Sequence, residues 1–310
     1  MPLPSGSSVF LLLGSNTNHR IYMRDLNYQL KNLCLRNKDG SFATQSNRQK
    51  ILHQIANQLH DMGFRQMQAE SLKAKHIDAL VKLWKASDLS AGVMKNRMSA
   101  LRWWAEKADR REAIAKDNAV YGIEKRQYVT NETKAVTLTS EQIASVKDAH
   151  VRASLALQAA FGLRREEAIK FNADYADRGD HISLKGSWTK GGRERIIPIT
   201  NEHQKEVLAQ VKLFAGKGSL IPSDKSYIQQ LKIYERHTAG AGLSKLHGLR
   251  HEYAQQRYQE LTGWQSPAQG GMQKKGMTQI QKDKDLEVRL LISQELGHER
   301  EQITAVYLGR

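Results

Sequence analysis

Hydrophobic residues recur at helical spacing along most of this 310-residue chain, and they alternate at strand spacing only between residues 181 and 199. The N-terminal third shows the helical pattern over 46–62, around 77–84 and again after Ser90, which is expected to cap the third helix. The apolar residues that define these three faces are Ile51, Ile55 and Leu59; Ile77, Leu80, Val81 and Trp84; and Met94, Met98, Leu101 and Ala105. The pattern predicts a fold that is mainly α with a small β-sheet.

The alternating region predicts short strands joined by a tight turn. His181–Leu184, Trp188-Thr189 and Arg195–Ile199 are the expected strands, and Gly191-Gly192 between them suits a turn with positive φ. Upstream, Ser140 is expected to cap a helix that has Glu141 in its first turn. Helical spacing returns after residue 200 and is broken over residues 262–285.

Breaks in the helical pattern predict how the chain is divided. We expect a poorly ordered tail over 1–20, a helical domain over 21–128, a linker over 129–138 and a second domain over 139–310. Within the second domain, the stretch 262–285 combines clustered glycines with many glutamines and lysines. This composition predicts a flexible basic insertion.

The chain is strongly basic, with 48 Lys and Arg against 32 Asp and Glu, a formal net charge of +16 and a pI of about 9.8. Residues 1–128 hold 21 basic and 11 acidic residues, a net of +10, and residues 129–310 hold 27 and 21, a net of +6. Such an excess predicts a polyanionic partner, with a merely solvated basic surface as the alternative. Lys95, Arg97 and Arg102 lie off the apolar face of the third helix and are candidates for contacting that partner.

Cysteine content and hydropathy exclude several classes of protein. Cys34 is the only cysteine, which rules out a disulfide within the chain and a zinc site built from cysteines. No run approaches the roughly 20 apolar residues of a membrane span. The short apolar run Val9–Leu13 has no basic residues before it, unlike a signal peptide. We expect a cytoplasmic protein with no membrane partner.

Six side chains in the second domain together provide what is needed to cleave a phosphodiester without a metal. Two guanidinium groups can hold the non-bridging oxygens, and a phenol can attack phosphorus. One imidazole can accept the phenol proton, an ammonium group can protonate the leaving oxygen, and a second imidazole can donate to the phosphate. In that order of roles the candidates are Arg164 and Arg250, Tyr307, His247, Lys190 and His298.

Each of these residues alone has a commoner structural explanation. Arg164 suits a surface ion pair, Lys190 an exposed turn, and Tyr307 the packing of a terminal helix. Their joint order and spacing is what favours a common site.

That order and spacing resembles the tyrosine recombinase, or phage integrase, family. The family shows Gly-Leu-Arg-x-x-Glu, a hairpin lysine before a basic strand that ends in Pro-[Leu/Ile], His-x-x-Arg, Leu-Gly-His, and a tyrosine nine residues after that last histidine. The matching residues are Gly162, Leu163, Arg164 and Glu167; Lys190, Arg193, Arg195, Pro198 and Ile199; His247 and Arg250; Leu296 to His298; and Tyr307. The resemblance covers 139–310 well and 21–128 more loosely, and it points to integrases of proteobacterial prophages and integrative elements.

The resemblance implies a site-specific recombinase that integrates or excises a mobile element through a 3′-phosphotyrosine. The implied roles are phosphate activation for Arg164, His247, Arg250 and His298, general acid for Lys190, nucleophile for Tyr307, ordering of the Arg164 region for Glu167, and further DNA contacts for Arg193 and Arg195. It also implies a C-shaped, two-domain clamp on duplex DNA at attachment sites. The protein would be a monomer in solution and a homotetramer in the synaptic complex. Accessory bending or directionality factors would assist, and no metal, ATP or other cofactor would be needed.

Two features depart from the family pattern, and two other functions share its residues. Arg250 and His298 are 48 residues apart, about twice the usual spacing, and only three residues follow Tyr307, where many relatives have a segment that docks on a neighbouring protomer. The alternatives are a type IB topoisomerase-like enzyme that relaxes DNA and a catalytically idle DNA-binding regulator on the same scaffold.

Overall fold

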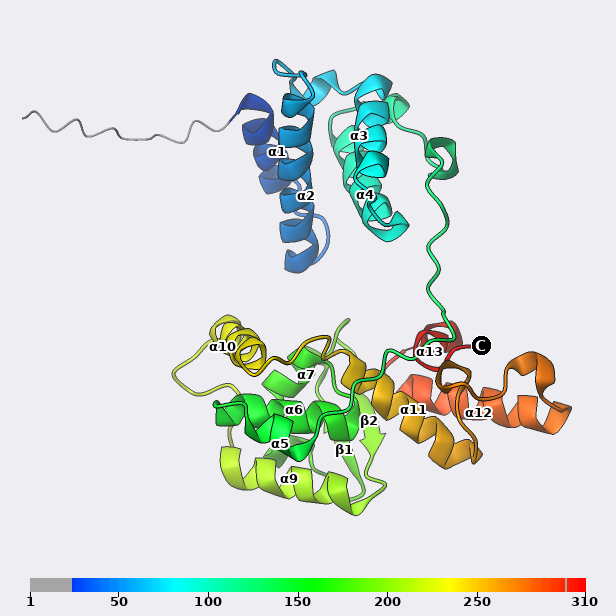
Figure 1. The fold of residues 1–310 in the computed structure, drawn as a ribbon. Helices are drawn as coiled ribbons and strands as arrows, with labels where there is room; N and C mark the ends of the chain where they lie inside the picture. The colour runs from blue at the N-terminus through cyan, green and yellow to red at the C-terminus, as the bar shows by residue number, and fades with distance from the viewer. Residues whose placement is uncertain (1–23, 299) are drawn as a thin grey trace, which may run out of the picture. The chain divides into compact units, whose positions relative to one another are not determined.

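The computed structural model describes residues 24–298 and 300–310, so the tail expected over 1–20 lies outside the described residues. The chain divides into two compact units that meet in the sequence between Arg126 and Gln127 (Figure 1). The described residues are mostly helical, and their one sheet has two strands. This confirms the expected mainly α fold with a small β-sheet. None of the described helices is long and apolar enough to cross a membrane.

The first unit is a helical bundle. Its described elements are α1 (Asp25–Arg36), α2 (Phe42–Asp61), η1 (Ala69–Ser71), α3 (Ala74–Ala86), α4 (Ala91–Lys107), η2 (Arg111–Ala113) and η3 (Ala119–Tyr121). Ser90 caps α4 as predicted, because its Oγ accepts from Val93 N at 3.4 Å. The four residues expected on the inner face of α4 are all buried, and they pack with the fully buried indoles of Trp84 and Trp104.

The second unit contains the small sheet and buries one of its two faces. Its described elements are α5 (Ser140–Ala144), α6 (Ala149–Phe161), α7 (Arg165–Lys170), α8 (Ala173–Ala176), β1 (His181–Leu184), η4 (Gly186–Trp188), β2 (Arg195–Pro198), α9 (Glu202–Ala215), α10 (Tyr227–Gly240), α11 (Gly248–Thr262), η5 (Pro267–Gln269), η6 (Lys274–Gly276), α12 (Gln279–Glu295) and α13 (Glu301–Leu308). Helix α6 packs on α7, α9 and α11, and α11 packs on α12 and α13 (Figure 1). The end of α6 and the starts of α7 and α11 are thereby brought close to α12 and α13.

The two predicted flanking strands exist, but the one expected between them does not. β1 and β2 pair antiparallel with Ile182 opposite Ile197, and both isoleucines are fully buried. The prediction of a strand at Trp188-Thr189 was wrong, because Trp188 ends the 3₁₀ turn η4. Its indole is buried against the rings of Phe171 and Tyr175, so core packing rather than strand pairing explains the apolar residue there.

The cap predicted at Ser140 lies one residue earlier. Thr139 Oγ1 accepts from Gln142 N at 3.2 Å, and Gln142 Oε1 accepts from Thr139 N at 2.9 Å. This reciprocal capping box satisfies two backbone donors, whereas Ser140 is already the first helical residue.

The stretch 262–285 has more regular structure than its composition suggests. It contains η5, η6 and the first residues of α12, and Met277 within it is buried. At its end, the Asp285 carboxylate accepts from Tyr258 Oη at 2.6 Å and from Arg289 Nε at 2.7 Å. Buried polar contacts therefore anchor the end of this stretch in the second unit, and its flexibility stays a prediction.

Candidate active site

A glycine turn between α6 and α7 places Arg164. Helix α6 ends at Gly162 with φ +59°, and a Cβ at this position would lie 2.6 Å from Tyr253 Cδ1. Both the left-handed backbone and the close approach of the tyrosine ring therefore require glycine. The turn ends at Arg164, which is the N-cap of α7.

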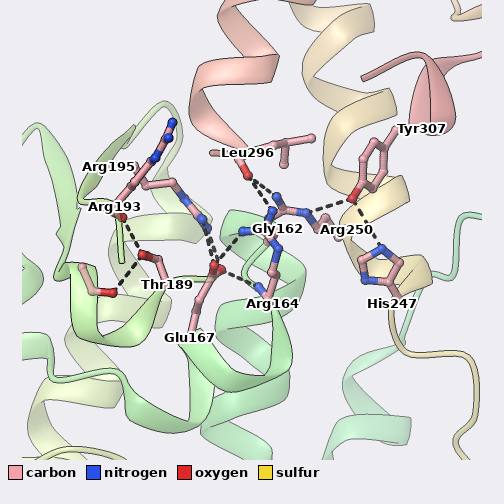
Figure 2. A network of polar contacts seen from close by, with 11 residues as sticks. Gly162, Arg164, Glu167, Thr189, Arg193, Arg195, His247, Arg250, Leu296 and Tyr307 are labelled. Carbon is pink, nitrogen blue, oxygen red and sulfur yellow. Dashed lines mark hydrogen bonds and ion pairs between the residues drawn. The ribbon is translucent and has the colours of Figure 1, made fainter. Parts of the chain in front are cut away.

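Glu167 lies at the centre of this region and is fully buried (Figure 2). Its carboxylate accepts from Arg164 N at 2.7 Å and Arg164 Nη1 at 2.8 Å, and from Arg195 Nη1 at 2.8 Å and Nη2 at 2.6 Å. Burial by itself disfavours the charged carboxylate. The Arg195 hydrogen bonds and the positive charges of Arg195, Arg250 and Arg164 together outweigh burial and lower the pKa of Glu167 to about 2. Glu167 thus fixes both the backbone and the side chain of Arg164.

This low pKa predicts an acid-dependent loss of stability. Glu167 titrates near 4.5 in an unfolded chain and near 2 in the folded protein, so its ion pairs contribute fully above pH 4.5. We expect the free energy of unfolding to decrease as the pH falls from about 4.5 toward 2. Denaturant titrations followed by circular dichroism at several pH values measure this decrease.

Glu167→Gln separates this contribution from that of other carboxylates. Removing one partner of a buried ion pair leaves Arg195 uncompensated, which typically costs about 3 kcal/mol or more. The variant is expected to be less stable than the wild type at neutral pH, and its stability is expected to change less between pH 4.5 and 2. An unchanged pH slope in the variant would contradict this account of Glu167.

Arg250 is the most enclosed cation of the site, with 1% of the residue exposed. Its Nη1 donates to Gly162 O at 2.5 Å, its Nη2 donates to Leu296 O, and its Nε donates to Tyr307 Oη at 3.3 Å. Burial lowers the pKa of Arg250 to about 10, which leaves it charged at neutral pH. Arg164 Nη2 also donates to Leu296 O, at 3.3 Å. One carbonyl therefore joins two guanidinium groups that lie far apart in the sequence.

The Tyr307 hydroxyl points toward Arg250 and His247 (Figure 2). It lies 3.4 Å from His247 Nε2, and the tyrosine residue is 6% exposed on α13. Burial, together with the charges of Arg250 and Arg164, lowers the pKa of His247. A neutral imidazole at this distance is suited to accept the phenol proton.

Two more histidine rings contact the Tyr307 ring. His298 stacks on it with ring centroids 5.5 Å apart, and His251 lies at 4.5 Å. Burial and nearby cations lower the pKa of His298 to about 3 and that of His251 to about 4, so both rings are neutral at pH 7. His251 was not among the residues predicted from the sequence, although its position four residues after His247 on a helix was the signal that both face the same side.

Lys190 lies on the exposed turn between β1 and β2. The following Gly191 and Gly192 have φ of +89° and +73°, and a Cβ on Gly186 would lie 2.4 Å from the Gly192 carbonyl oxygen. Lys190 lines a cavity of about 490 Å³ together with Arg164 and His298. The hairpin thus presents an ammonium group to the same cavity as a guanidinium and an imidazole of the site.

Arg195 was expected to contact DNA, but the structure places it inside the site. Its side chain is buried, and both Nη atoms bond Glu167, so it serves as a structural partner inside the site. Arg193 is exposed on the same hairpin, and its carbonyl accepts from Thr189 Oγ1 at 2.5 Å (Figure 2). Arg193 lies in the turn before β2, whereas Arg195 is the first residue of that strand. The regular alternation of a strand therefore orients only Arg195, whose side chain points inward.

The three candidates in the first unit also differ among themselves. Arg97 is buried with its guanidinium 5.3 Å from the Trp84 ring, which corrects its expected position off the apolar face of that helix. Arg102 donates to Ala115 O at 3.0 Å and Asn118 Oδ1 at 2.6 Å, so it holds the segment after α4. Lys95 is partly exposed and remains a candidate for contacting DNA.

Comparison with known proteins gives both a family and a fold. Two family models match in succession, the N-terminal domain of phage integrase over residues 23–114 and integrase over residues 124–256. No curated protein matches the sequence.

Solved structures with similar folds include three recombinases. Lambda integrase in a dimer bound to a COC′ core site matches with a TM-score of 0.59 and 17% identity, over 92% of this chain and 78% of that chain. The Tn1549 transposon integrase with circular intermediate DNA matches with a TM-score of 0.53 and 12% identity, over 93% of this chain and 96% of that chain. The XerH site-specific recombinase with a palindromic difH substrate matches with a TM-score of 0.53 and 16% identity, over 92% of this chain and 81% of that chain. At these identities the similarity establishes the fold.

The matched domains and the fold define an enzyme that breaks and rejoins DNA. The chain belongs to the tyrosine recombinase, or phage integrase, family. The resemblance inferred from the sequence motifs is thereby confirmed.

Proposed function

We propose that this protein is an integrase that inserts or excises a mobile element by site-specific recombination, with Tyr307 as the nucleophile. The observation that carries the proposal is the position of the Tyr307 hydroxyl, which hydrogen-bonds both Arg250 Nε and His247 Nε2 of its own chain. A phenol held between a guanidinium and a neutral imidazole has a partner for its proton and a positive field for its anion.

The cleavage step follows from this arrangement. His247 takes the phenol proton, Tyr307 Oη forms a bond to phosphorus, and the bond from phosphorus to the 5′ oxygen breaks. Lys190, at the edge of the cavity, gives its proton to that leaving oxygen. The product is a 3′-phosphotyrosine and a free 5′-hydroxyl, and the reverse reaction rejoins a strand without an external energy source.

The two arginines and His298 stabilise the charge that develops on the non-bridging oxygens. A guanidinium carries five N–H donors, and the contacts described above use three of those on Arg250. Because Glu167 and Leu296 O already fix the guanidinium groups, little reorganisation is needed when a phosphate binds. His298, which lines the same cavity as Arg164 and Lys190, supplies a neutral donor.

DNA is the partner that the family and the charge both favour. Lambda integrase has been solved as a dimer on a core site and as a tetramer on a Holliday junction. By analogy, we propose that the two units of this chain grip duplex DNA at an attachment site in the cytoplasm, as a homotetramer during strand exchange. Accessory DNA-bending or directionality factors would then set the direction of the reaction.

Covalent capture tests the proposal and identifies the attachment site in the same experiment. The protein is incubated with a pool of nicked duplexes of random sequence, and the DNA that becomes joined to protein is recovered and sequenced. A nick a few nucleotides to the 3′ side of the cleaved bond lets the short fragment that carries the new 5′-hydroxyl diffuse away, so the adduct accumulates. Enrichment of one sequence class supports a site-specific recombinase. Relaxation of supercoiled plasmid without sequence preference would favour the topoisomerase alternative, and binding without any adduct would favour the regulator.

Affinity for the captured DNA is expected to decrease steeply with salt. Cationic side chains that contact phosphates release counterions, and several such contacts reduce affinity on the order of 10³-fold between about 50 and 200 mM salt. Fluorescence anisotropy at a series of salt concentrations measures the slope. An affinity that hardly changes over this range would show that the net charge of +16 is not used to hold DNA.

A further inference from the structure

The chain segment that leads from the first unit into the second lies against the nucleophile helix. We call residues 131–136 the strap. At the start of the strap, both polar atoms of the Asn131 side chain bond the backbone of Arg310. Nδ2 donates to Arg310 O at 2.9 Å, and Oδ1 accepts from Arg310 N at 2.9 Å. The strap thereby binds the chain three residues beyond Tyr307.

A second contact from the strap reaches the backbone of the nucleophile itself. Thr133 Oγ1 donates to Gln255 Oε1 at 2.9 Å, and Gln255 Nε2 donates to Tyr307 O at 2.9 Å. Gln255 lies on α11 and is 1% exposed, so this relay passes through the core of the unit. Thr133 itself is exposed, so the relay joins a surface hydroxyl to the buried carbonyl of Tyr307.

The end of the strap meets the start of α11. Val136 N donates to Gly248 O at 3.1 Å, and a Cβ on Gly248 would lie 2.4 Å from Val136 Cγ2. Gly248 follows His247 directly. The same short segment therefore contacts the backbone on both sides of the hydrogen bond between Tyr307 and His247.

The residue after α13 shows how closely its end is held. Gly309 has φ +75°, and a Cβ there would lie 2.6 Å from Asn131 Oδ1 and 2.7 Å from Ala268 N. From the other side, Arg289 Nη1 donates to Gly309 O at 2.9 Å. A helix of eight residues is thus fixed at its C-terminal end largely by side chains from other segments.

We propose that Asn131, Thr133 and Gln255 are positioning residues that hold Tyr307 in its cleaving position, and that the strap couples the first unit to the nucleophile. The coupling rests on continuity, because Asn131 is only five residues past Arg126, where the first unit ends. The hydrogen bonds of Asn131 to Arg310, and of Thr133 through Gln255 to Tyr307, connect this segment to α13 and the residues that follow it. The proposal builds on the proposed function of Tyr307 and adds a control over it.

The test compares variants that remove the contacts of the strap with control variants that keep them. Asn131→Ala removes the two hydrogen bonds to the Arg310 backbone, which we call the clamp. Thr133→Val removes the hydrogen bond to Gln255 and keeps a side chain of nearly the same shape. Thr133→Ser keeps the hydroxyl, and Glu132→Gln changes an exposed residue between the two contacts. Single-turnover adduct formation is measured at saturating captured DNA, with DNA affinity, melting temperature and hydrogen exchange of residues 301–310 measured alongside.

We expect Asn131→Ala to form the adduct about tenfold more slowly, because a small displacement of a nucleophile is enough for such a loss. Thr133→Val is expected to be slowed several-fold, while Thr133→Ser and Glu132→Gln match the wild type. DNA affinity and melting temperature should be unchanged, and α13 should exchange faster in the two defective variants.

Three outcomes overturn the proposal. Unchanged adduct rates in both defective variants would remove the positioning role, as would a loss that scales with lower melting temperature or affinity. Wild-type exchange of α13 in Asn131→Ala would show that the clamp does not hold the helix. Hydrogen exchange of α13 does not depend on DNA cleavage. If the wild-type protein formed no adduct, the proposed function would be refuted, and the exchange measurement would still test whether Asn131 holds α13.

Discussion

Replacing Tyr307 by phenylalanine is expected to abolish the covalent adduct while leaving DNA binding intact. The change removes one oxygen, the atom that would attack phosphorus, and no other group in the site can replace it at that position. The ring keeps its packing against His251 and His298, so the shape of the site should not change. Adduct gels with the captured nicked duplex measure the loss, and anisotropy with the same duplex measures the affinity.

A second tyrosine in the same unit provides the matched control. Tyr234 Oη accepts a hydrogen bond from Gln158 Nε2 at 2.9 Å, and the residue is buried outside the network around Arg250. Tyr234→Phe is therefore expected to keep the adduct. If Tyr307→Phe still became joined to DNA, another residue would be the nucleophile and the assignment would be wrong.

Lys190→Ala is expected to slow cleavage by about 10²- to 10⁴-fold, the range typical for removal of a general acid or base. The defect should depend on the leaving group. A duplex whose scissile 5′ oxygen is replaced by sulfur needs no proton donor, because a thiolate leaves readily as an anion. With that duplex the variant is expected to cleave at nearly the wild-type rate, and single-turnover kinetics on the two substrates measure the difference.

Lys185 offers a control within the same hairpin. Its Nζ lies 4.0 Å from the centroid of the Tyr175 ring, and it does not line the cavity that Lys190 lines. Lys185→Ala should cleave both substrates at the wild-type rate. An equal loss on the oxygen and sulfur substrates in Lys190→Ala would mean that the lysine binds phosphate rather than donating a proton. Tyr307→Phe should stay inactive on both substrates, which distinguishes loss of the nucleophile from loss of the acid.

Local sequence signals were sufficient at several places where the structure depends on neighbours a few residues apart. Ser90 caps α4, and Gly191 and Gly192 take the positive φ that the turn needs. Such signals also gave the order of the motifs, and from it the family. Where a local signal was misread, as at Trp188, an apolar residue served the core instead of a strand.

Three arginines show what local sequence signals cannot predict. Arg97, Arg102 and Arg195 all resemble exposed cations in the sequence, yet each is buried or partly buried against a specific partner. The partner of Arg195 is Glu167, 28 residues earlier in the chain. Burial of a charge depends on which opposite charge or ring the packing brings to it, and spacing along the chain does not contain that information.

The sequence by itself determined the mainly helical fold, the family and the six candidates for the chemistry, because periodicity and short motifs are properties of neighbouring residues. Only the tertiary structure decided which donors meet which acceptors. It joined Arg164 to Arg250 through the Leu296 carbonyl, added His251 beside Tyr307, and laid Asn131 across the end of the nucleophile helix. These contacts link segments 46 to 179 residues apart, and hydrogen bonds over such separations are fixed by the packing of helices rather than by any local pattern.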